Sequence, residues 1–341
     1  MKLEEIGFYT LSDERAMHAS HRSPLWRCEL IITDKCNFSC PYCRGLRDDC
    51  KGVMPIEYAK KVIARWRHDR LKNIRFSGGE PTLHSGLLEL VKYSKKNGVK
   101  RIAISTNGSA NLKLYNELIE AGVNDLSISL DACCAATNEI MSGKKEIWEH
   151  VLNNIKELSK KTYVTVGVVL TEQNENEMFE IIDLASLDLN VSDIRIIPAA
   201  QYKSNLTNND RLKAYQNSTK HPILRYRLNN LIAKKSVRSL AKTDFHYCPL
   251  VLDDMAVAGI YHFPCIIYLR EQGNPIGIVS RMQKVRMDRK EWFLNHNCYE
   301  DPICRNNCLD VCVDYNNKWS IFNKWSWFKQ LSFNKLKLNK L

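Results

Sequence analysis

Apolar stretches of strand length alternate with amphipathic stretches of helix length over the first 200 residues. Strand-like runs occur at 28–33, 73–77, 101–105, 125–130, 163–170 and 193–198. Helix-like segments lie between them at 56–69, 84–97, 111–121, 145–159 and 174–187, where apolar residues such as Leu152, Ile155 and Leu158 recur at helical spacing. Strands that alternate with helices in this way predict an α/β fold with a parallel sheet.

Polar residues at the ends of these strands are candidates for chemistry, because β/α barrels place their active sites at the carboxyl ends of the strands. Asn107 follows the third run, Ser129 and Asp131 end or follow the fourth, and Arg195 lies inside the sixth. Each also has a purely structural interpretation. Asn107 can belong to a turn, Asp131 can cap a helix, and Arg195 can lie on the outer face of the sheet.

Composition narrows the class of protein. The chain has 341 residues, 13 cysteines and a formal net charge of +12. It has no apolar run long enough to cross a membrane, and its acidic start does not resemble a signal peptide. Cysteines without an export signal favour metal ligation in a reducing compartment, so we expect a cytoplasmic protein. The net positive charge indicates that the protein attracts negatively charged partners, and it carries no information about the fold.

Three cysteines stand close together after the first strand-like run. Cys36, Cys40 and Cys43 lie in the run Cys-Asn-Phe-Ser-Cys-Pro-Tyr-Cys, with spacings of three residues and then two. Three thiolates are one too few for the four irons of a cubane cluster, which is usually held by four cysteines. The fourth iron would be open to an outside ligand, as the open position of a catalytic zinc is. A zinc knuckle is the alternative interpretation.

A glycine pair follows the second strand-like run. Residues 73–77 lead directly into Gly78, Gly79, Glu80 and Pro81. Glycines at a strand end let the backbone approach a ligand closely, because no Cβ stands in the way. Such a turn is common by itself, but one strand–helix unit after the cysteine triad it favours a ligand site and argues against a zinc knuckle.

The triad, with the aromatic Tyr42 before its last cysteine, and the Gly-Gly-Glu turn resemble the radical S-adenosylmethionine (SAM) superfamily. The resemblance implies a partial (β/α)6 barrel over 24–200 and a 4Fe-4S cluster on Cys36, Cys40 and Cys43 that binds SAM. It also implies SAM contacts to the methionine moiety, ribose and carboxylate, made by Tyr42, Gly78, Gly79, Glu80, Asn107, Ser129, Asp131 and Arg195.

A second set of six cysteines lies near the C-terminus: Cys248, Cys265, Cys298, Cys304, Cys308 and Cys312. Their spacing resembles the SPASM and Twitch extensions of the superfamily, which hold auxiliary iron–sulfur clusters. The chain departs from the full SPASM pattern, since Asn295 stands where the first cysteine of a Cys-x2-Cys pair is expected. Six thiols are too few for two fully ligated clusters, so we expect one auxiliary 4Fe-4S cluster with two thiols left over. A structural zinc site is the alternative.

The expected organisation is therefore an N-terminal extension at 1–23, the barrel at 24–200, a linker or helical segment at 201–245, a Cys-rich domain at 246–316 and a basic aromatic tail at 317–341. The tail combines lysines with Trp319, Phe322, Trp325, Trp327, Phe328 and Phe333. Such a tail can bind nucleic acid or lie on a membrane surface. We favour a helix that packs its aromatic face on the protein, which is the commoner use of such a stripe.

The resemblance implies reductive cleavage of SAM to a 5′-deoxyadenosyl radical, which takes hydrogen from an unactivated carbon, with flavodoxin or ferredoxin as the electron donor. The outcome could be oxidation, isomerisation or another modification. The positive charge and the tail favour an anionic substrate such as a nucleotide or nucleic-acid base. The alternatives are a SPASM-type enzyme that modifies a ribosomally made peptide, a small sugar or cofactor precursor as substrate, and a non-catalytic iron–sulfur or zinc module. The short segment before the first strand, with no room for a leader-binding domain, lowers the peptide alternative.

Overall fold

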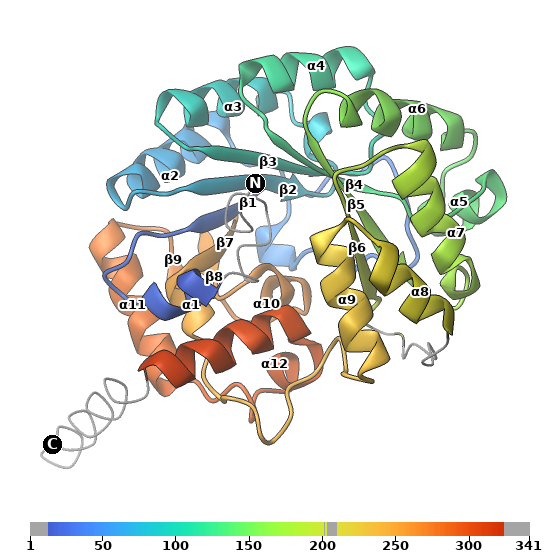
Figure 1. Ribbon diagram of the computed structural model, residues 1–341. Helices are drawn as coiled ribbons and strands as arrows, with labels where there is room; N and C mark the ends of the chain where they lie inside the picture. The colour runs from blue at the N-terminus through green and yellow to red at the C-terminus, as the bar shows by residue number, and fades with distance from the viewer. Residues whose placement is uncertain (1–12, 201, 203–209, 324–341) are drawn as a thin grey trace, which may run out of the picture.

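A nine-stranded sheet organises the protein (Figure 1). The computed structural model describes residues 13–200, 202 and 210–323, and its strands follow the order β6-β5-β4-β3-β2-β1-β7-β8-β9. Neighbours from β6 to β7 pair in parallel, and β8 and β9 add antiparallel pairs. The strands are β1 Arg27–Thr33, β2 Asn73–Gly78, β3 Arg101–Thr106, β4 Asp125–Ser129, β5 Tyr163–Leu170, β6 Asp193–Pro198, β7 Asp254–Ala258, β8 Tyr261–Phe263 and β9 Gly277–Ile278. The predicted α/β class with a parallel sheet of partial-barrel type is confirmed.

Helices connect the parallel strands and cover the outer face of the sheet, as the arc of α2, α3, α4 and α6 in Figure 1 shows. They are α1 Asp13–His18, α2 Ile56–His68, α3 Leu87–Lys96, α4 Leu112–Ala121, α5 Ala135–Ser142, α6 Trp148–Ser159, α7 Met178–Asp183, α8 Asp210–Ser218, α9 Pro222–Ile232, α10 Ile266–Arg270, α11 Met282–Asn295 and α12 Pro302–Asn307, followed by helical residues 310–323. The helix expected at 174–187 is present as a continuous helical run, in which a 3-10 turn at Glu175–Glu177 leads into α7 and α7 passes into one π-helical turn at Leu184–Asp188.

The two faces of the strands differ in polarity. In β1, Cys28, Leu30 and Ile32 are fully buried in the core between sheet and helices, and the same alternation recurs in the neighbouring strands. Side chains on the other face are largely polar, and Glu29 and Arg75 are examples. Successive strand residues point to opposite faces, so one face builds the core while the other lines the interior of the barrel.

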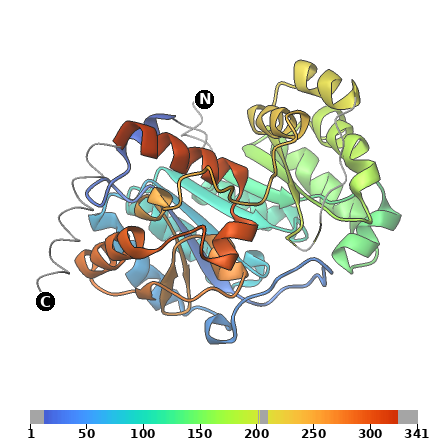
Figure 2. The ribbon, with the colours of Figure 1, turned by 90° about the horizontal axis from the view of Figure 1, so that it is seen from below.

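The Cys-rich segment shares the sheet of the barrel. β7 pairs in parallel with β1, and its register runs from Arg27↔Asp254 to Ile31↔Ala258. Figure 2 shows the orange and red C-terminal elements at the end of the molecule that holds the blue β1 region, away from the green and yellow elements. The stretch 246–316, for which we expected a Cys-rich domain, contributes β7 to β9 to the sheet beyond β1.

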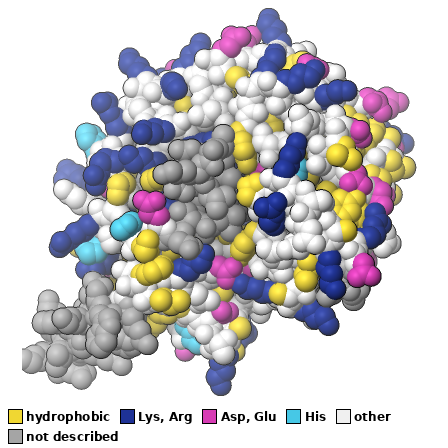
Figure 3. Space-filling view, in the orientation of Figure 1, with side chains coloured by type: hydrophobic (Ala, Val, Ile, Leu, Met, Phe, Trp, Pro, Cys, Tyr) yellow, Lys and Arg dark blue, Asp and Glu magenta, His cyan; other side chains and the backbone are white. Residues whose placement is uncertain are grey.

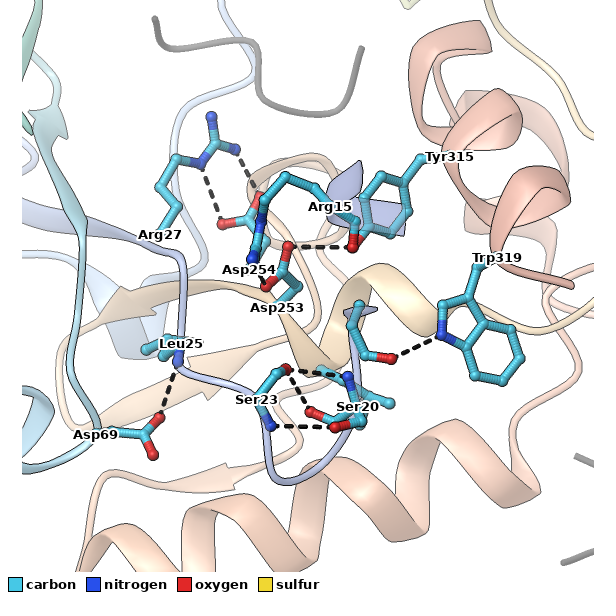
Figure 4. A network of polar contacts seen from close by, with 12 residues as sticks. Arg15, Ser20, Ser23, Leu25, Arg27, Asp69, Asp253, Asp254, Tyr315 and Trp319 are labelled. Atoms are coloured by element: carbon cyan, nitrogen blue, oxygen red, sulfur yellow. Dashed lines mark hydrogen bonds and ion pairs between the residues drawn. The ribbon is translucent and has the colours of Figure 1, made fainter. Parts of the chain in front are cut away.

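A polar network ties both ends of the described chain to this junction (Figure 4). Asp253, just before β7, pairs with Arg15 of α1 and accepts a hydrogen bond of 3.0 Å from the Tyr315 hydroxyl. Trp319 donates from Nε1 to the carbonyl of Ala19 at 2.7 Å. Within the described residues, no helix is long and apolar enough to cross a membrane.

Candidate functional site

The cysteine triad lies on the loop that leaves the carboxyl end of β1. Cys36 and Cys43 are exposed and Cys40 is half-buried. The loop is held from two sides, because Glu80 N donates to Lys35 O at 2.7 Å and Ser39 N donates to Ser142 O at 2.9 Å. All three thiols line one cavity of about 230 Å³ at the strand ends.

The glycine pair lets the end of β2 approach this loop. A Cβ on Gly78 would stand 2.1 Å from Thr33 O, and one on Gly79 would stand 2.3 Å from Lys35 O. Both contacts are with backbone, which cannot move aside, so any larger residue would push the loop away from β2. Gly78 and Gly79 also line the cavity beside the cysteines.

Glu80 has a different place from the two glycines. Its side chain is fully buried and outside the cavity lining, and burial raises the pKa of its carboxyl. Oε1 accepts hydrogen bonds from Thr82 N at 3.0 Å and Thr106 Oγ1 at 2.8 Å, and Oε2 accepts one from Asn107 N at 2.7 Å. In this structure Glu80 joins the ends of β2 and β3.

Tyr42 joins the cysteine loop to β4. Its hydroxyl donates to Asp131 Oδ2, and Asp131 Oδ1 accepts from Val169 N at 2.5 Å. Burial raises the pKa of Asp131 to about 6, although both hydrogen bonds oppose that shift. Tyr42 and Asp131 both line the cavity with the thiols.

The other predicted strand-end residues also line this cavity. Asn107 Nδ2 donates to Asn37 Oδ1 at 2.9 Å and lies 4.0 Å from Cys36 Sγ, while Ser129 is exposed. Arg195 faces the inside of the barrel, 3.4 Å from Ser127 Oγ, and burial lowers its pKa to about 10. The predicted residues that line the cavity around the triad are therefore Tyr42, Gly78, Gly79, Asn107, Ser129, Asp131 and Arg195. Glu80 is the one predicted SAM-binding residue that lies outside this lining.

Arg270 belongs to this site, and no sequence pattern indicated it. It ends α10, and its guanidinium donates to Gly45 O at 2.9 Å and to Gly78 O at 2.6 Å. It therefore connects the cysteine loop with the glycine turn, although it lies 225 residues beyond Gly45 and 192 beyond Gly78. Its pKa is lowered by burial.

A wider cavity of about 390 Å³ opens beside the triad and carries mostly positive charge. Its charged lining consists of Asp34, Arg44, Lys51, Arg238 and Arg270. Arg44 pairs with Glu271, and Arg238 donates from Nε to Pro198 O at 2.8 Å. Burial first, and then the neighbouring charge of Arg44, lower the pKa of Arg238 to about 10. Glu271 is an anion that these two guanidinium groups already share, because it pairs with Arg44 and its charge raises the pKa of Arg238 against the effect of burial.

The six C-terminal cysteines also converge. The Cys298 thiol contacts those of Cys248 and Cys304, and the Cys308 thiol contacts that of Cys312. Cys265 caps α10, where its Sγ accepts from Tyr268 N at 3.4 Å. His296, which no sequence pattern indicated, lies among these cysteines, and its Nε2 is 3.9 Å from Cys304 Sγ.

The donor sets fit iron–sulfur ligation. Three thiols on one loop face a shared cavity, where backbone and polar strand-end groups leave room for a small ligand. Six more thiols meet between β7, α10, α12 and residues 310–323, enough for one four-thiolate cluster.

Comparison with known proteins agrees with this geometry. Residues 30–185 match the family model described as "Radical SAM superfamily". The chain is 29% identical over 203 residues to the molybdenum cofactor biosynthesis protein moc-5 of Caenorhabditis elegans, a match that covers 55% of this chain and 32% of that protein. It is 26% identical over 220 residues to a probable GTP 3′,8-cyclase of Sulfurisphaera tokodaii, covering 60% of this chain and 70% of that protein.

A solved structure with a similar fold is that of Streptococcus suis SuiB bound to its precursor peptide SuiA. It superposes with a TM-score of 0.59 at 13% identity, covering 86% of this chain and 69% of that chain. At this identity the likeness concerns the fold. Because the superposition covers 86% of this chain, the structural likeness extends beyond residues 30–185 into the Cys-rich C-terminal segment.

Proposed function

Because residues 30–185 match the radical SAM superfamily model, we propose that the chain is a radical SAM enzyme that binds a 4Fe-4S cluster and SAM at the triad cavity. We propose further that it acts on an anionic substrate, a nucleotide in the first instance. The observation that carries the substrate class is the cation-lined cavity next to the triad. The curated relatives named GTP 3′,8-cyclase support the same class.

Cys36, Cys40 and Cys43 would hold the cluster, with one iron left for SAM. The chemistry that these cofactors supply when bound is one-electron cleavage of SAM into methionine and a 5′-deoxyadenosyl radical, which removes hydrogen from the substrate. The electron would come from a donor such as flavodoxin or ferredoxin.

The chain's own residues would bind and orient the two ligands. The backbone of Gly78 and Gly79 would meet the methionine end of SAM, and Asn107 and Ser129 would meet its polar groups at the strand ends. Asp131 holds Tyr42, and so the cysteine loop, through a hydrogen bond. Arg238 and Arg44 would bind the anionic part of the substrate, with Arg44 exchanging its ion pair with Glu271 for the substrate, since guanidinium groups suit phosphate geometry.

The test of the reaction is SAM cleavage by anaerobically reconstituted protein with dithionite. We expect release of 5′-deoxyadenosine and about eight irons per chain, four for each cubane. Changing Cys36, Cys40 and Cys43 together to Ala should abolish the release and leave about four irons. Undiminished SAM cleavage by this variant would contradict the assignment of the cluster.

The substrate class is tested with GTP as probe and uncharged guanosine as its control. We expect GTP, but not guanosine, to raise the release of 5′-deoxyadenosine above the level without substrate. R238Q should lower that stimulation roughly tenfold or more, because hydrogen bonds to charged groups contribute about 1.5–3 kcal/mol.

R67Q serves as the matched control, since Arg67 is an exposed arginine on α2. Equal stimulation by guanosine, or equal effects of R238Q and R67Q, would contradict an anionic substrate at this cavity. Stimulation by peptides but by no nucleotide would favour the peptide alternative.

A further inference from the structure

A histidine and two cysteines meet away from the triad. His296 follows the end of α11, Cys298 lies two residues later, and Cys304 lies on α12. The imidazole nitrogen and the two sulfurs all lie within 4.8 Å of one another, and Cys298 is only 5% exposed.

The spacing of these three atoms suits a single metal ion. Zinc binds thiolate sulfur at about 2.3 Å and imidazole nitrogen at about 2.0 Å, so its tetrahedral ligands stand less than about 4 Å apart. The cysteines of a cubane each bind a different iron, so their sulfurs surround a much larger object. A mixed sulfur and nitrogen donor set with tetrahedral spacing is typical of zinc.

Neighbouring groups hold His296 and Cys304 in place. The His296 ring stacks on Trp292 with centroids 4.0 Å apart, and its Nε2 faces Cys304 Sγ at 3.9 Å. Asp301 Oδ1 accepts from Cys304 N at 3.1 Å at the start of α12, and its Oδ2 lies 3.3 Å from His296 Nε2. Tyr268 fixes that same Oδ2 with a hydrogen bond of 2.8 Å. Such supporting contacts orient metal ligands in proteins.

The thiol count agrees with two separate sites. Six cysteines converge in this region, and removing Cys298 and Cys304 leaves four, which is the number that one cubane needs. The four that remain are Cys248, Cys265, Cys308 and Cys312, and the Cys248 thiol contacts that of Cys298, so the two sites adjoin. Asn295 stands where a Cys-x2-Cys pair would begin, so a second cubane lacks a ligand there, while His296 offers a nitrogen one residue later.

We propose that His296, Cys298 and Cys304 bind one zinc ion, with Asp301 or a water molecule in the fourth position, beside an auxiliary cluster on the other four cysteines. The ion joins the end of α11 to α12 and so stabilises the Cys-rich segment. The zinc site does not depend on SAM chemistry, although the second iron cluster beside it belongs to the proposed function.

The experiment is metal analysis of the full chain, purified without air from cells grown with both iron and zinc. We expect about one zinc per chain beside about eight irons. X-ray absorption at the zinc edge should show two sulfurs at about 2.3 Å, with nitrogen or oxygen at about 2.0 Å completing the shell.

The variants H296A and C304S should each lose the zinc and keep the iron. H246A is the matched control, because His246 lies nearby but stacks on Tyr299 and hydrogen-bonds Lys242 O. Twelve irons without zinc, zinc bound by four sulfurs, or full zinc in H296A would overturn the proposal.

Two readouts separate this proposal from the proposed function. The Cys36, Cys40 and Cys43 triple variant should lose SAM cleavage and about four irons but keep its zinc. Should the zinc-site variants fail to fold, the absorption spectrum of the unaltered protein still decides between zinc and iron.

Discussion

Arg270 connects two parts of the candidate site that lie far apart in the sequence. Its two donors reach the carbonyls of Gly45 and Gly78, one on the cysteine loop and one on the glycine turn. Burial lowers the pKa of its guanidinium. The two terminal nitrogens of the guanidinium each donate a hydrogen bond to one of these carbonyls. Its contacts therefore make it a positioning residue for the triad.

R270Q should reduce both the stability and the SAM affinity of the protein. The glutamine side chain is shorter and cannot bridge both carbonyls, so we expect a loss of about 1.5–3 kcal/mol in the free energy of unfolding. We also expect a higher KM for SAM with a smaller change in kcat. Urea unfolding and SAM-cleavage kinetics measure the two effects. A variant with unchanged KM would show that Arg270 does not position the SAM site.

At the scale of elements, Asp193 attaches α9 to the end of the sheet. This residue begins β6 and is fully buried. Its carboxylate accepts from Ile223 N at 3.2 Å and Leu224 N at 3.4 Å, both in the first turn of α9. The N–H groups in the first turn of a helix are usually bonded by the side chain of the N-cap residue. Here a carboxylate from β6 accepts those hydrogen bonds instead.

D193N should destabilise the protein by about 1–3 kcal/mol, because the amide turns an N–H donor toward a backbone donor. The effect should depend on pH. Burial raises the pKa of Asp193 to about 6, so the native state holds a proton that the unfolded chain loses near pH 3.8. The contribution of Asp193 to stability is therefore present below that pH and falls as pH rises through about 6.

The penalty of D193N should accordingly be larger near pH 4 than near pH 7, as urea unfolding at the two pH values would show. A penalty that grows with pH would contradict the raised pKa.

At the scale of the whole molecule, a buried ion pair joins both ends of the described chain to the extended sheet. Arg15, Asp253 and Tyr315 come from α1, the residue before β7 and residues 310–323 (Figure 4). The Arg15 guanidinium also stacks 3.7 Å above the Trp26 ring. Trp319 packs close by against Phe293 and is 5% exposed.

D253A should lower the free energy of unfolding by about 3–5 kcal/mol, because it removes the carboxylate that pairs with the buried guanidinium of Arg15. Y315F removes one hydrogen bond and should cost about 1 kcal/mol. The control D49A breaks a surface pair with Arg47 and should cost at most about 1 kcal/mol. Equal urea midpoints for D253A and D49A would show that the network does not hold the ends together.

Positively charged side chains lie both on the surface of the whole molecule and in the cavity beside the triad. On the face drawn in Figure 3, Lys and Arg side chains are scattered among other types rather than gathered in one patch. Arg44 and Arg238, the two arginines of the proposed anion site, line the cavity beside the triad. Of the basic aromatic tail, Trp319 is a packing residue and Phe322 is 52% exposed, while Trp325, Trp327, Phe328 and Phe333 lie outside the described residues.

The sequence by itself determined the barrel. Hydrophobic periodicity predicted the six parallel strands within two residues at each end, because each strand buries its apolar face locally against its own helices. It missed α5 and the strands β7 to β9. These strands are short, and β7 is stabilised by pairing with β1, more than 200 residues away.

The sequence also indicated the triad and the glycine turn, since both are local motifs with fixed spacing. Only the tertiary structure decided which partners they have. It buried Glu80 behind the cavity wall, turned Arg195 inward, and brought Arg270 and Arg238 to the triad from distant segments. It likewise placed His296 beside Cys298 and Cys304. Contacts of this kind depend on how strands and helices pack, and packing is set by the whole chain rather than by any short stretch of it.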